Sequence, residues 1–129
     1  MSQKPTLQTP RARVNFLGSA KTGTQHAWLM RLTSFALLPL TIAFILLVLS
    51  LAGRDFESAR ILLGSACPAI LMLLFVGVGV YHMTLGMQVI IEDYIPAGHS
   101  RELALMANIC FGLLMGVALI YALLRLSFT

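Results

Sequence analysis

The chain has 129 residues, of which 58% are hydrophobic and 11% are charged, and its mean hydropathy is +0.87. This composition leaves too little polar surface to cover a water-soluble globule, so it indicates an integral membrane protein. The formal net charge of +4 comes mostly from the N-terminal segment, and we interpret it as a topology signal rather than as a nucleic-acid-binding surface.

Residues 1–17 are polar, basic and contain proline, which predicts a flexible arm rather than a folded domain. Cytoplasmic segments next to membrane helices carry an excess of lysine and arginine. Before the first apolar run there are five cations and no acidic residue, the cations being Lys4, Arg11, Arg13, Lys21 and Arg31. The N-terminus is therefore expected in the cytoplasm, and an odd number of spans places the C-terminus in the periplasm.

Residues 18–129 are expected to form one domain of three membrane-spanning helices, at about residues 32–52, 69–91 and 103–124. At 1.5 Å per residue, each run is long enough to cross a hydrocarbon core of about 30 Å. Arg31 precedes the first run. Its guanidinium either reaches the membrane surface or binds a carboxylate-bearing cofactor, and its position alone favours neither interpretation.

The second run contains His82, which lies within the charge-free stretch 61–91 and about 15 Å along a helix from Glu92. Burial disfavours imidazolium, so a neutral ring at this depth has a lone pair for a metal or a proton. Gly79 and Gly86 lie about one turn away on the same helical face. This pattern fits a flat porphyrin beside the imidazole, and it fits equally well close helix packing with His82 hydrogen-bonded across the interface.

The second run ends at Glu92, Asp93 and Tyr94, and Pro96 is expected to stop the helix and to keep the preceding residue extended. Tyr94 is either an aromatic anchor at the membrane surface or a phenol donor to a quinone carbonyl. From the residues alone we favour the anchor.

The third run carries Asn108, Gly112 and Gly116 at four-residue spacing, which predicts a helix-packing face. Cys67 and Cys110 lie far apart in apolar surroundings and are interpreted as inert thiols of the interior. No phosphate-binding loop, nucleophile elbow or carboxylate pair is evident, so no catalytic residue is assigned. Three short spans bury little of their own surface, which indicates a partner membrane subunit.

Two segments carry a resemblance to a known family: Gly23 to Arg31 with the following Leu-Thr-Ser, and His82 to Tyr94. The second has the pattern His-x-x-x-Gly followed by Asp-Tyr, with the tyrosine twelve residues after the histidine. Together with the three apolar runs, they resemble the membrane-anchor D subunits of succinate:quinone oxidoreductase, or respiratory complex II. The companion C subunit usually has a serine-histidine-arginine segment before its first helix, and this chain has none.

The resemblance implies an all-α membrane protein whose three helices pack with a second, cytochrome b556-type C anchor around a shared haem b. His82 would be one axial ligand of the haem iron, and Arg31 would lie near the haem propionates or the quinone pocket. Tyr94 would bind the substrate ubiquinone, with Asp93 beside it. FAD and the iron-sulfur clusters would belong to the flavoprotein and iron-sulfur subunits, held at the bacterial inner membrane for respiratory electron transport and the tricarboxylic acid cycle.

Three other functions share part of this pattern. A fumarate reductase anchor would have the same architecture, and a haem-free structural subunit would account for the glycines. A small transporter component would use the buried histidine as a proton site. A haem absorption spectrum distinguishes the last two functions from a complex II anchor.

Overall fold

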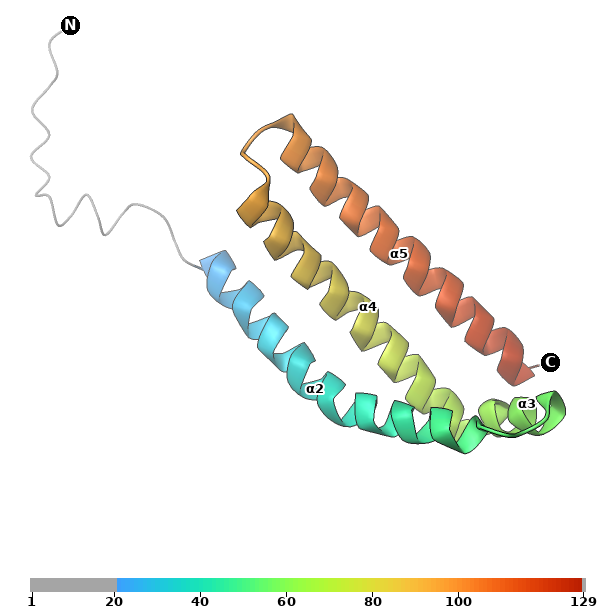
Figure 1. Ribbon diagram of the computed structural model, residues 1–129. Helices are drawn as coiled ribbons and strands as arrows, with labels where there is room; N and C mark the ends of the chain where they lie inside the picture. Colours follow the sequence, from blue (N-terminus) through green and yellow to red (C-terminus); the bar gives the residue numbers. More distant parts are fainter. Residues whose placement is uncertain (1–20, 129) are drawn as a thin grey trace, which may run out of the picture.

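The computed structural model describes residues 21–128, with side chains from residue 24 onward, so the arm predicted for residues 1–17 lies outside the described residues. The described part is all-helical, in the order α2 (Lys21–Leu51), α3 (Phe56–Gly64), α4 (Ala66–Tyr94) and α5 (His99–Phe128). Helix α4 packs against both α2 and α5. The start of α2 and the turn between α4 and α5 lie at one end of the molecule, and α3 and the end of α5 lie at the other (Figure 1).

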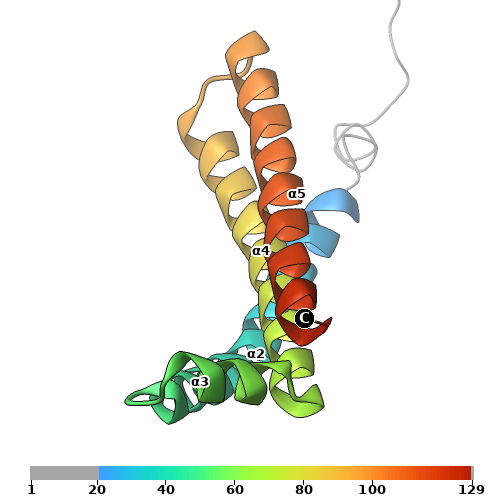
Figure 2. The same ribbon diagram turned by 90° about the vertical axis from the view of Figure 1, so that its right-hand side faces the viewer.

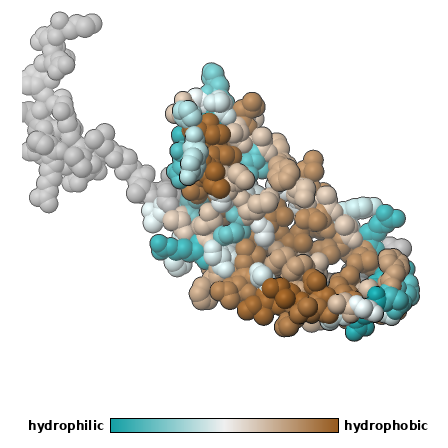
Figure 3. Space-filling model, viewed as in Figure 1, coloured by the Kyte–Doolittle hydropathy of each residue, from teal (hydrophilic) through white to brown (hydrophobic). Residues whose placement is uncertain are grey.

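Three helical stretches are long and apolar enough to cross a membrane: Thr24–Leu51, Ala66–Tyr94 and His99–Phe128. This confirms the prediction of an all-α protein with three spans. The helices extend beyond the apolar runs because polar residues at their ends continue the backbone hydrogen bonding. Figure 3 shows hydrophobic residues over much of the visible face and hydrophilic residues gathered towards the ends.

Helix α3 was not expected from the sequence. Gly53 makes the turn before it with a φ of +80°, and Asp55 caps its first turn. The Asp55 carboxylate accepts hydrogen bonds from the Ser58 hydroxyl at 2.6 Å and the Ser58 backbone N–H at 3.4 Å. Both bonds lower the pKa of Asp55 below its usual value, and the bond from the Ser58 hydroxyl has the larger effect. Figure 2 shows α3 lying across the end of the three long helices.

Helix α2 curves along its length (Figure 1) and contains Pro39. Proline has no backbone N–H, so the Phe35 carbonyl, one turn earlier, has no donor at this position. A missing bond of this kind bends a helix without ending it when neighbouring helices support it. Helix α2 therefore continues to Leu51.

The isolated chain has a very small interior. Among the described residues, only two large apolar side chains are buried, Leu85 and Ile91. Helices in lipid are held together by close backbone approach and polar contacts rather than by a hydrophobic force. Asn108 is buried and donates from Nδ2 to the Thr84 carbonyl at 2.9 Å, and Gly112 lies against the same threonine. The predicted packing face of α5 is thus confirmed.

Both cysteines, Cys67 and Cys110, are exposed. The interpretation of these residues as interior thiols is therefore wrong. Apolar neighbours in the sequence indicate burial in a water-soluble protein, but on a membrane helix they are equally compatible with a side chain that faces lipid or another subunit.

We expect Gly112→Ala to weaken the packing of α5 on α4, because an added Cβ would overlap Oγ1 of Thr84. Overpacking typically costs about 1–3 kcal/mol, so thermal unfolding of the purified protein in detergent should begin at a lower temperature. Gly116→Ala is the matched control, since its Cβ would meet Val80 Cγ1 at an ordinary 3.6 Å. Adding Thr84→Ala should restore most of the loss. Equal stability of the two single glycine variants would contradict the close contact.

Candidate functional site

His82 lies near the middle of α4, is half-buried and faces α2. Its Nδ1 is 2.8 Å from Oγ1 of Thr33, a buried residue of α2. The same hydroxyl lies 2.9 Å from the Leu29 carbonyl and 3.0 Å from the Met30 carbonyl, one turn earlier on α2. The Thr33 hydroxyl therefore links the imidazole by hydrogen bonds to the backbone of the neighbouring helix.

The glycines on either side of His82 also face α2. A Cβ on Gly79 would lie 4.0 Å from Leu37 Cδ2, and a Cβ on Gly86 would lie 3.7 Å from Met30 Cε. Both are ordinary van der Waals distances, so side chains of α2 fill the space beside these glycines. A methyl group would therefore fit at either position, so neither glycine is required for the helix approach seen here, and a flat ligand near His82 would lie against another part of its surroundings.

A suitable place for such a ligand is a shallow groove of about 450 Å³ beside His82. The groove is lined by His82 and by one face of α2, made up of Ser34, Leu37, Leu38, Thr41 and Ile42. Most of its wall is apolar, and His82 forms part of that wall. Because the groove is open at the side of the chain, a group bound there would also contact whatever packs against α2.

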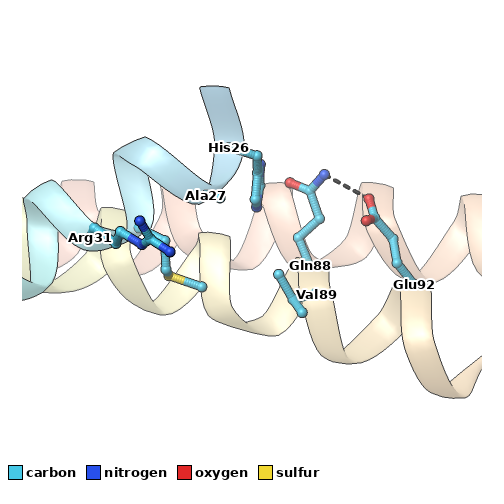
Figure 4. Close-up of a pocket in the computed structure, with 7 residues that line it drawn as sticks. His26, Ala27, Arg31, Gln88, Val89 and Glu92 are labelled. Carbon is cyan, nitrogen blue, oxygen red and sulfur yellow. Dashed lines mark hydrogen bonds between the residues drawn. The ribbon is translucent and has the colours of Figure 1, made fainter. Parts of the chain in front are cut away.

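A second pocket, of about 670 Å³, lies where α2 begins and α4 ends (Figure 4). It is lined by His26, Ala27, Met30 and Arg31 of α2 and by Gln88, Val89 and Glu92 of α4. The Gln88 amide donates to the Glu92 carboxylate at 2.8 Å. The pocket therefore combines a permanent cation, a carboxylate and an imidazole at the end of the bundle, a set of groups suited to the polar part of a ligand.

His26 is the least expected member of this pocket. Its Nε2 is buried and has no hydrogen-bond partner among the residues that the structure describes. Buried polar atoms are nearly always paired, so this nitrogen marks a position for a ligand, water or another subunit. From the sequence, His26, Gln88 and Glu92 had no predicted binding role. His26 was missed because the first helix was expected to begin at residue 32, and Gln88 and Glu92 were missed because their pocket depends on how α2 packs against α4. A helix that starts earlier puts His26 and Arg31 on neighbouring turns.

The remaining candidate residues lie outside this pocket. Tyr94 is 83% exposed and Asp93 is also exposed, at the last turn of α4. Ile95 follows with extended backbone angles, φ −100° and ψ 121°, so the expected effect of Pro96 is confirmed. The structure therefore brings Arg31 and Glu92 into one pocket and leaves Tyr94 on the outer surface of this chain.

The fold and these two sites define a class of protein: a three-span helical membrane subunit with exposed apolar faces and a histidine at the wall of a lateral groove. The chain belongs to the succinate dehydrogenase/fumarate reductase transmembrane subunit family, whose model matches residues 5–120. The resemblance of this chain to the membrane anchors of complex II is thereby confirmed.

Similar proteins are succinate dehydrogenase hydrophobic membrane anchor subunits. That of Paracoccus denitrificans is 37% identical over 119 residues, which cover 92% of each chain. That of Rickettsia bellii is 36% identical over 107 residues, 81% of this chain and 84% of the relative. The subunit of Rickettsia conorii is 31% identical over 107 residues, 82% of this chain and 85% of the relative. No solved structure matches the chain.

Proposed function

We propose that this chain anchors the flavoprotein and iron-sulfur subunits of a succinate dehydrogenase at the cytoplasmic face of a bacterial inner membrane. The names of its relatives support this assignment and favour it over a transporter component or a fumarate reductase anchor. The basic N-terminal segment supports a cytoplasmic N-terminus and a periplasmic C-terminus. In that orientation the pocket of His26 and Arg31 opens on the cytoplasmic side, where the other subunits would dock.

The second anchor would cover part of the exposed apolar surface. Phe35 of α2 is 82% exposed and Val117 of α5 is 68% exposed. Lipid can cover such side chains, but the open groove beside His82 is a better match for a protein or cofactor surface with a complementary shape. We therefore place the cytochrome b556-type partner against the α2 side of the molecule.

His82 would supply one ligand to the iron of a haem b shared with that partner. The observation that carries this proposal is the imidazole at the wall of an apolar groove, hydrogen-bonded through Nδ1 to Thr33 at 2.8 Å. Nε2 forms no hydrogen bond with any described residue and is the nitrogen left to bind iron. Haem, when bound, adds a one-electron redox centre inside the membrane.

Arg31 would hold the anionic or carbonyl end of a bound group, either a haem propionate or the ubiquinone head. Arg31 lines the larger pocket together with His26, and a guanidinium can donate two parallel hydrogen bonds to a carboxylate. Tyr94 would donate a hydrogen bond to a ubiquinone carbonyl, with Asp93 beside it. Because Tyr94 is so exposed in this chain, residues of other subunits would have to complete the quinone site.

The first test is a dithionite-reduced minus oxidised spectrum of the complex purified through a tag on this chain. We expect a b-type band and co-purification of a flavoprotein, an iron-sulfur protein and a second anchor. His82→Ala should remove or displace the band, whereas the control His99→Ala, at an exposed histidine paired with Glu102 at 3.7 Å, should not. A normal band in His82→Ala would exclude His82 as the ligand. If the three proteins do not co-purify, the anchoring role is wrong.

Tyr94→Phe should leave the haem spectrum unchanged and slow quinone reduction by about 10- to 100-fold, because the quinone carbonyl loses a hydrogen-bond and proton donor. Succinate oxidation with a soluble artificial acceptor should keep its normal rate, since that reaction does not need the membrane site. Tyr81→Phe on the same helix is the matched control. Normal quinone reduction in Tyr94→Phe would return Tyr94 to an interfacial anchoring role.

A further inference from the structure

We infer that Thr33 is a positioning residue for His82: its hydroxyl determines which ring nitrogen is available to a metal and fixes the orientation of the ring. The inference rests on the proposed function and deepens it. Nothing in the local sequence around His82 points to Thr33, which lies 49 residues away on another helix.

The direction of the hydrogen bonds follows from counting protons. A threonine hydroxyl has one proton to donate. Oγ1 of Thr33 is within 2.9 Å and 3.0 Å of the Leu29 and Met30 carbonyls, which can only accept. Donation to a carbonyl one turn earlier is the usual arrangement of threonine within a helix. The hydroxyl oxygen then acts as an acceptor towards His82 Nδ1 at 2.8 Å, so Nδ1 carries the ring proton.

A neutral imidazole that is protonated on Nδ1 has its lone pair on Nε2. Thr33 therefore selects Nε2 as the ligating nitrogen. In the opposite arrangement the hydroxyl would donate to Nδ1, Nε2 would carry the proton, and no lone pair would remain for iron. At membrane depth no bulk water is present to replace the threonine, so loss of its hydroxyl removes this selection.

The geometry also restricts rotation of the ring. Thr33 is buried and β-branched, so its side chain has few accessible rotamers. Leu37 and Met30 of α2 lie next to Gly79 and Gly86, about one turn away on either side of His82, so α2 and α4 pack together around the ring. Partners of this kind orient a metal-binding histidine and raise its basicity, and their loss typically lowers metal affinity by about 10- to 100-fold.

The test compares Thr33→Val, which removes the hydroxyl at nearly constant shape, with Thr33→Ser, which keeps it. Thr84→Val is the matched control, because Thr84 Oγ1 donates at 2.9 Å to Val80 of its own helix. Each variant is studied as the whole complex, and assembly is quantified by its flavin content. The readouts are the rate of haem transfer to apomyoglobin and the g-values of the oxidised haem in electron paramagnetic resonance. Neither readout depends on enzyme activity.

We expect Thr33→Val to lose haem about 10- to 100-fold more readily and to show shifted g-values, with Thr33→Ser and Thr84→Val close to the parent. A parent-like Thr33→Val would overturn the inference, and so would a Thr33→Ser that behaves like Thr33→Val. If Thr33→Val does not assemble, Thr33→Ala removes the same hydroxyl with a smaller side chain and is judged by the same outcomes. His82→Ala separates failure of this inference from failure of the proposed function. A normal haem spectrum in that variant would refute the assignment of His82 as a ligand of the haem iron.

Discussion

The hydrocarbon core offers no water to polar groups, and the rest of this structure depends on that constraint. Helices satisfy the backbone, so the remaining problem is the few polar side chains at membrane depth. Thr33 and His82 pair across α2 and α4, and Asn108 reaches the backbone of α4 from α5. The hydrogen bonds that satisfy these polar side chains therefore also join the three spans. Helix α4 takes part in both, which explains its place in the middle.

The two sides of α4 serve different purposes. Towards α5 the helices approach closely, with Gly112 so near Thr84 that even a methyl group has no room. Towards α2 there is a second polar contact, but also a lateral groove at His82 and a larger pocket at Arg31. The α5 side thus has the tighter packing, and the α2 side carries the groups that would bind a ligand under the proposed function. With the tight packing on the opposite side of α4, the groove and the pocket can stay open without loss of the fold.

Much of this arrangement could be predicted from the sequence, but only the part encoded locally. Hydropathy predicted the three spans, and the charge-free stretch around His82 predicted its place inside the second of them. Helix α3 was missed because Asp55 and a short, partly polar helix give no hydropathy signal. Thr33 was missed for a different reason: its contact with His82 depends on the register between two helices, which no local spacing determines. The cysteines were misassigned because an apolar segment does not distinguish an interior from a lipid-facing surface.

The open groove has a further consequence for assembly. A ligand held between two anchors contacts each of them with only part of its surface, so neither anchor alone binds it fully. Binding of the ligand and association of the anchors are then linked, and each strengthens the other by the same free energy. In this chain the half-buried imidazole of His82, the exposed Tyr94 and the His26 Nε2, which has no partner among the described residues, are the groups that the proposed partner and ligand would complete. Under the proposed function this chain would supply one half of a binding site, and the partner anchor would add contacts to the small interior of the described part of the chain.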